Sequence, residues 1–198
     1  MKSPSFFPIL VLLLFVLSGL HAQDIRIGIK GGENLDKMGG RSFTGVCKGG
    51  YTLGGYAEIG FGKWGLQPEL DWMQVNLQTA NNFNTIYPQY GGLNGANVTL
   101  NNLSIPILLT FRPIKVLSIL AGPQFDLLSN QEGNVAAYTQ HAFREGNFSI
   151  TGGVQLNLSR FKLGARYFLG LSELNGLNST LDSWKNQGLL VYLGFRLH

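Results

Sequence analysis

The sequence predicts an all-β protein, an eight-stranded antiparallel up-and-down transmembrane β-barrel, from three observations. Only 13% of the residues are charged, about half the share found in soluble domains. Apolar and other residues alternate with a period of two in eight segments, and the connections between these segments are short and long in turn. These features exclude both an ordinary soluble surface and a bundle of apolar helices.

The period-two alternation predicts the strands. In one segment, for example, Trp64, Leu66, Leu70 and Trp72 alternate with more polar residues. Successive side chains of a strand point to opposite faces, so each segment predicts a strand with one apolar face. The eight predicted strands are 25–30, 51–61, 64–73, 103–112, 117–127, 148–157, 161–171 and 189–197.

The connections predict how the barrel is oriented. Three are short enough for hairpins: 62–63, 113–115 and the turn around Ser159-Arg160. The other four, approximately 32–50, 76–98, 128–147 and 172–187, are rich in Asn, Gly, Gln and Ser. Their strict alternation places all long loops at one end and both termini at the other. Transmembrane barrels have this pattern, with short periplasmic turns and long outer loops.

A soluble eight-stranded barrel has the same alternation but turns its apolar face inward. The mixed face here carries Gly, Ser, Thr, Gln and scattered charges, which suit a narrow interior better than a solvated surface. Aromatic residues on the apolar face also favour a membrane protein, because they predict two interfacial girdles. One girdle adjoins the short turns and the other the long loops: Phe61, Trp64, Phe111 and Phe161, and Tyr51, Trp72, Phe125 and Phe148.

Charged residues on the opposite face are expected inside the barrel. They are Arg26, Lys30, Glu58, Glu69, Asp71, Arg112, Asp126, Lys162, Arg166 and Arg196. An eight-stranded barrel is just wide enough for side chains to fill it, so ion pairs without a continuous channel are favoured. This predicts a structural or surface-interaction role. The alternative is a narrow porin-like pore or an accessory component of a secretion system.

Pro68, Pro106 and Pro123 fall inside predicted strands. Each lacks the N–H that a strand donates to its neighbour. We expect a bulge or an unpaired site at each of them.

The N-terminal segment predicts export. Residues 1–22 have the features of a signal peptide: Lys2, an apolar run over 6–17 and a small residue, Ala22, at the predicted cleavage site. The apolar run is too short for a membrane helix. Residues 23–198 would then form the barrel domain in the outer membrane, with membrane lipid and the barrel-assembly machinery as partners.

The sequence gives little indication of catalysis, metal binding, cofactor binding or nucleic-acid binding. A catalytic hypothesis would rest on His141, a loop histidine near Arg144 and Glu145, and a lone loop histidine does not predict an enzyme. His141, His198 and the single Cys47 match no metal-ligand spacing. No cofactor is predicted, and a net charge of +4 is too small and dispersed to predict nucleic-acid binding.

The long loops are the predicted functional surface. In the loop 76–98, two tyrosines and a cluster of asparagines are candidates for contact with an extracellular or secretion partner or a surface polysaccharide: Tyr87, Tyr90, Asn81, Asn82 and Asn84. The alternative is a variable loop without a specific ligand.

Several motifs resemble one known family. The segments IGIKGGENL at 27–35, LQPEL at 66–70, LSIPILL at 103–109, AGPQF at 121–125, and GARY at 164–167 followed by LGL at 169–171 resemble, in order, those of PorT-like outer-membrane β-barrel proteins of Gram-negative bacteria. The resemblance implies an integral outer-membrane barrel of the porin family and no catalytic residues. The secretion and gliding role of the name-giving member is not transferred. One departure is the end of the last strand, where Leu197 replaces the usual final aromatic residue.

Overall fold

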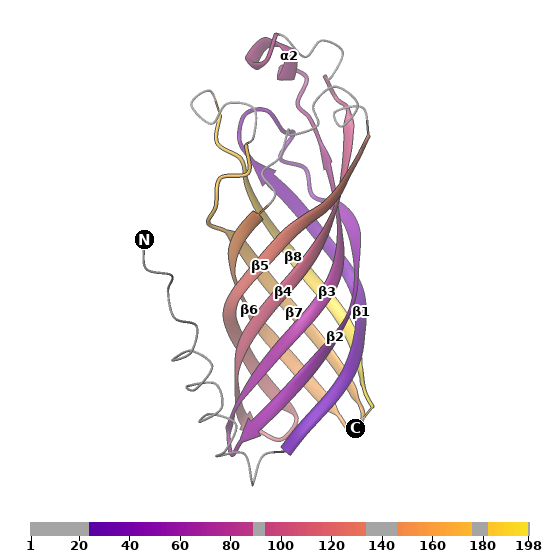
Figure 1. Cartoon of the computed structure of the whole chain (residues 1–198), viewed down its shortest axis with the longest axis vertical. Helices are drawn as coiled ribbons and strands as arrows, with labels where there is room; N and C mark the ends of the chain where they lie inside the picture. The colour runs from indigo at the N-terminus through magenta and orange to yellow at the C-terminus, as the bar shows by residue number, and fades with distance from the viewer. Residues whose placement is uncertain (1–23, 89–93, 134–145, 176–181, 198) are drawn as a thin grey trace, which may run out of the picture.

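Eight antiparallel strands form a closed barrel in the computed structural model, which describes residues 24–88, 94–133, 146–175 and 182–197. Each strand pairs with the next in sequence, and the last pairs with the first (Figure 1). The strands are β1 (Asp24–Gly39), β2 (Lys48–Phe61), β3 (Trp64–Gln78), β4 (Asn97–Ile114), β5 (Leu117–Gly133), β6 (Gly146–Leu158), β7 (Phe161–Gly170) and β8 (Lys185–Arg196). This confirms the predicted fold class.

The two ends of the barrel differ as the connections predicted. Three tight turns, the start of β1 and the end of β8 lie at one end, called the short-turn end (Figure 1). Gly62 and Ser159 have positive φ values of 67° and 58° in two of these turns. At the opposite loop end lies the short helix α2 (Phe83–Ile86). No helix in the described part of the chain is long and apolar enough to cross a membrane.

The three prolines are accommodated without a register shift. The pairing skips Pro68 between β2 and β3, Pro106 between β3 and β4, and Pro123 between β4 and β5. Each proline still has a partner on its other side, for example Ile107 for Pro68. Each proline, which lacks an N–H, therefore interrupts the pairing of its strand on one side only. The expected unpaired sites are present, whereas the register shifts of β4 and β5 lie elsewhere, at Asn101/Asn102 and Phe111/Ile114.

Several strands continue beyond the predicted segments, and the polarity of their two faces reverses there. In β3, Trp72 is exposed on the outer face, but the next inward residues Met73, Val75 and Leu77 are apolar and buried. Val98 and Leu100 of β4 are buried in the same way. This reversal is expected where the strands of a membrane barrel leave the bilayer, because their outer face then meets water and their apolar residues turn inward. The loops predicted over 32–50 and 76–98 are shorter for this reason.

Candidate functional site

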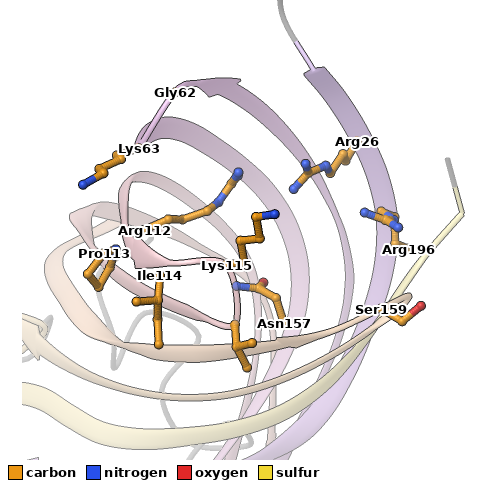
Figure 2. Close-up of a pocket in the computed structure, with 11 residues that line it drawn as sticks. Arg26, Gly62, Lys63, Arg112, Pro113, Ile114, Lys115, Asn157, Ser159 and Arg196 are labelled. Atoms are coloured by element: carbon orange, nitrogen blue, oxygen red, sulfur yellow. The ribbon is translucent and has the colours of Figure 1, made fainter.

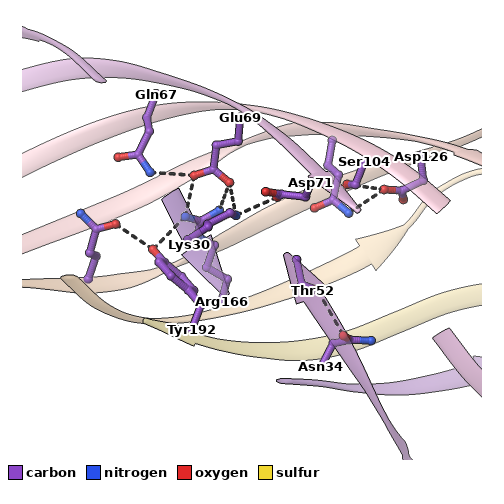
Figure 3. A network of polar contacts seen from close by, with 12 residues as sticks. Lys30, Asn34, Thr52, Gln67, Glu69, Asp71, Ser104, Asp126, Arg166 and Tyr192 are labelled. Atoms are coloured by element: carbon purple, nitrogen blue, oxygen red, sulfur yellow. Dashed lines mark hydrogen bonds and ion pairs between the residues drawn. The ribbon is translucent and has the colours of Figure 1, made fainter. Parts of the chain in front are cut away.

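The middle of the barrel is crossed by a buried ion-pair network centred on Glu69 (Figure 3). Arg166 donates two hydrogen bonds to its carboxylate, at 2.6 and 2.7 Å. Lys30 bridges Glu69 at 2.5 Å and Asp71 at 2.7 Å, and Gln67 donates to Glu69 at 2.6 Å. These side chains come from β1, β3 and β7, so the network ties opposite walls together. A buried charge needs such paired, hydrogen-bonded surroundings.

Two tyrosines complete this layer. The Tyr192 hydroxyl accepts a hydrogen bond from Arg166 at 2.8 Å and donates one to Gln155 at 2.8 Å. Lys162 lies over the Tyr56 ring, 4.4 Å from its centroid. Both rings are almost fully buried. Their large volume helps to fill the barrel at the level of the ion pairs.

A second ion cluster lies nearer the short-turn end. The buried carboxylate of Glu58 contacts Arg112 and Lys162, and it lies 3.8 Å from Arg26. Among the described side chains of this cluster, three cations therefore share one carboxylate.

A third polar group lies nearer the loop end. Asp126 accepts hydrogen bonds from Ser104 at 2.6 Å, Gln124 at 2.8 Å and Asn147 at 3.1 Å. Asn34 contacts Asp36 and accepts a hydrogen bond from Thr52 at 3.1 Å. A cavity at this level, lined in part by Thr52 and Asp71, measures only about 10 Å³, space for about one water molecule.

The structure thus places the ten predicted interior charges in two settings. Lys30, Glu58, Glu69, Asp71, Asp126, Lys162 and Arg166 are buried within the barrel. Arg26, Arg112 and Arg196 are partly exposed and line the opening at the short-turn end.

The loop end is closed by an apolar cluster, which we call the outer cap. Its central residue is Trp184, which is fully buried. Phe43 packs edge-on against Trp184 at 5.0 Å between ring centroids, and Tyr87 packs against it at 5.9 Å. Phe83 of α2 and the inward residues of the strand extensions complete the cluster. The cap therefore sits on the polar layers and seals them from the loop side.

Asp182 holds the segments of the outer cap together. Its carboxylate accepts hydrogen bonds from the backbone N–H groups of Arg41 and Ser42, at 3.0 and 2.8 Å, and from the indole Nε1 of Trp184, at 3.2 Å. Burial raises the pKa of Asp182, but hydrogen bonds from Ser42, Arg41 and Trp184 outweigh it, so the pKa lies below its ordinary value. The ionised carboxylate is thus the form that the cap stabilises.

Asn175 links the end of α2 to Asp182. Its side-chain amide donates to the Tyr87 hydroxyl and to the Asp182 carbonyl, both at 2.7 Å. Tyr87 is fully buried, and burial raises the pKa of its hydroxyl. The expectation that Tyr87 is available to a partner is therefore wrong, because its ring fills the apolar cap.

The remaining candidates of that loop are placed differently. Asn81 and Asn82 are exposed, and Asn84 is half-buried. Tyr90 lies outside the described residues, as do His141 and His198.

Cys47 is an exposed free thiol. In the described part of the chain, no group of three or more His, Cys, Asp or Glu side chains could hold a metal ion.

The predicted girdle residues lie on the outer face at two levels. Trp64 and Phe111 pack together at 4.7 Å near the short turns, and Phe125 and Phe148 pack at 5.0 Å toward the loops. The other members of the two sets are exposed, namely Phe61, Phe161, Tyr51 and Trp72. Sequence reasoning did not include Phe195, which packs against Phe161 at 5.3 Å.

The outward face between the girdles is almost entirely apolar. Ile27, Leu53, Leu70, Leu109 and Val191 are each 44% exposed or more, which is the surface a barrel presents to lipid. The sequence also matches the family model described as outer membrane protein beta-barrel domain over residues 19–176. The chain belongs to this family of outer-membrane β-barrels. Its short-turn end is accordingly the periplasmic end, and its loop end faces outward.

Ail and Neisserial surface protein A share this fold at low sequence identity. Ail of Yersinia pestis, determined in a phospholipid bilayer nanodisc, is 13% identical with a TM-score of 0.50, over 88% of this chain and 100% of that one. Neisserial surface protein A is 9% identical with a TM-score of 0.50, over 88% and 99%. OprG of Pseudomonas aeruginosa is 12% identical with a TM-score of 0.44, over 89% and 95%. No curated protein matches the sequence.

Proposed function

We propose that this outer-membrane barrel is a non-enzymatic platform that presents its outer loops to a partner, and that it is not a solute pore. The observation that carries the proposal is the outer cap. Its buried Trp184, Tyr87 and Phe83 seal the loop end above an interior already crossed by ion pairs. An end closed by buried apolar side chains suits recognition better than passage of solutes.

The surface above the cap has the composition of a polar recognition site. Asn81, Asn82, Thr85 and Asn94 are exposed around α2, and the Asn94 side chain accepts a hydrogen bond from the backbone of Asn84 at 2.9 Å. Amide side chains both donate and accept hydrogen bonds. They suit a hydroxyl-rich ligand such as a surface polysaccharide.

The biogenesis of the barrel belongs to the same proposal. Residues 1–22 act as the signal peptide, and residues 23–198 form the domain that the assembly machinery inserts. The motifs at 27–35, 66–70 and 121–125 support placing the chain in the PorT-like branch, without transfer of a secretion role.

Two measurements on the same folded protein test the proposal. Planar-bilayer recordings should show no discrete conductance. Bacteria producing the wild-type protein should be retained on immobilised polysaccharides more strongly than bacteria producing Asn81→Ala/Asn82→Ala, with Lys63→Ala at the periplasmic end as control. Discrete conductance would favour the pore instead, and equal retention of all three strains would refute the loop surface.

A further inference from the structure

The periplasmic mouth of the barrel is a concave basic pocket, which the proposed outer surface does not use. It has a volume of about 630 Å³, and the described residues that line it include Arg26, Lys63, Arg112, Lys115 and Arg196 but no Asp or Glu. We propose that this pocket binds a phosphate-bearing anion at the inner face of the outer membrane.

Each short turn contributes to this positive charge. Lys63 lies in the β2–β3 turn, Lys115 in the β4–β5 turn and Arg160 in the β6–β7 turn. The end of β8 adds Arg196, whose backbone N–H donates to the Arg160 carbonyl at 2.8 Å. Basic residues thus come from four different positions at this end of the barrel, and three of them, Lys63, Lys115 and Arg196, line the pocket itself.

The acidic groups near the pocket do not balance this charge. Glu58, which contacts the lining residue Arg112, is 2% exposed and is already shared by several cations. Among the described side chains, Lys115 and Arg196 have no carboxylate within ion-pairing distance.

The side chains converge as an anion site requires. In Figure 2, Arg26, Arg112, Lys115 and Arg196 extend toward one opening, whereas Lys63 lies at the rim and points away. The planar guanidinium matches two phosphate oxygens at once, and the lysine ammonium adds a point charge. A concave wall of low dielectric strengthens the attraction.

The position of the pocket allows two sources of phosphate. Ile114 and Val116 flank Lys115 and are 61% and 46% exposed, an apolar edge suited to the acyl chains of a phospholipid. The pocket also opens to the periplasm, from which a soluble phosphate could enter. The shared chemistry is a phosphate group held by arginine and lysine, and the experiment separates the sources.

The test uses calorimetric titration of inorganic phosphate into the folded barrel in phosphatidylcholine nanodiscs. Saturable binding is expected. It should weaken by about 25-fold in Lys115→Gln/Arg196→Gln, because each cation near an anionic group contributes about fivefold. The matched control, Lys37→Gln/Lys185→Gln, removes two charges at the outer end and should bind as the wild type does. Retention of the heat-resistant folded form on gels verifies that both variants are folded.

Nanodiscs that contain phosphatidylglycerol distinguish the sources. If the headgroup is the ligand, phosphatidylglycerol should suppress phosphate binding to the wild type and should be retained preferentially in native mass spectra. If soluble phosphate is the ligand, phosphate binding should be unchanged in these discs. Equal binding by the two double variants, or neither saturable phosphate binding nor lipid retention, would overturn the proposal.

Discussion

The ring of Tyr192 lies across Gly164, its direct partner on the neighbouring strand, and occupies the space that a side chain at 164 would need. Tyr56 is related to Gly28 in the same way. Each glycine lets a tyrosine lie against the inner wall, where the ring packs beside the buried cations. The small and large residues of the interior are therefore matched across strands.

Gly164→Ala should destabilise the barrel, because its methyl group would overlap the Tyr192 ring. Overpacking a filled interior costs about 1–3 kcal/mol. Gly152→Ala is the matched control, since a Cβ there finds its nearest neighbour at 3.6 Å. Urea unfolding in lipid vesicles measures both variants, and equal free energies of unfolding would contradict the packing relationship.

Arg166→Ala should lower stability much more than Lys185→Ala. Arg166 is 2% exposed and bidentate to Glu69, and removing one partner of a buried pair costs about 3–5 kcal/mol. Lys185 is exposed at the outer end of β8. Its loss should stay within about 0.5 kcal/mol. The temperature at which the folded form is lost on gels measures the difference, and two equal temperatures would contradict a role for the network.

Ile107→Arg should impair assembly because it places a charge near the middle of the lipid-facing surface. Ile107 is 40% exposed and pairs with Pro68, between the two girdles. Arginine at the bilayer midplane costs about 2–4 kcal/mol, and less near the interfaces. Ile119 is paired with the girdle residue Phe111, so Ile119→Arg is the interfacial control. Quantifying folded protein in outer-membrane fractions tests the order, and comparable amounts of both variants would argue against these depths.

Acidification should loosen the outer cap through Asp182. Its pKa in the folded protein lies below the ordinary value, which is about 3.9. Its stabilising contribution is therefore complete above about pH 4 and is lost as the pH falls through the lower, folded-state pKa.

Fluorescence of Trp184 reports on this step once Trp64 and Trp72, the other two tryptophans, are replaced by phenylalanine. The emission should shift to longer wavelength between pH 7 and pH 2. Most of this shift should be absent in Asp182→Asn, whose cap should be weaker already at pH 7. An unchanged acid transition in that variant would show that another group opens the cap.

Much of the barrel could be predicted because period-two alternation is a local property of the chain. Alternation predicts that Ile107 faces outward, and the short connection between two alternating segments predicts the tight turn at Ser159. The missing N–H groups predict the skipped pairings at the three prolines. The strand extensions could not be predicted in the same way. Met73, Val75 and Leu77 keep the period of two, but their polarity reverses outside the bilayer, where the outer face meets water.

The sequence by itself determined the eight strands, their inward and outward faces and the orientation of the loops, since these depend on neighbouring residues and on the solvent that each face meets. Only the tertiary structure decided that Glu69 pairs with Lys30 and Arg166, that Asp182 holds the segments of the cap together beside Trp184 and that basic residues line the periplasmic mouth. Closing the barrel brings β1 against β8 and sets residues far apart in sequence side by side. That closure depends on the register of all eight pairings together, which no single segment specifies.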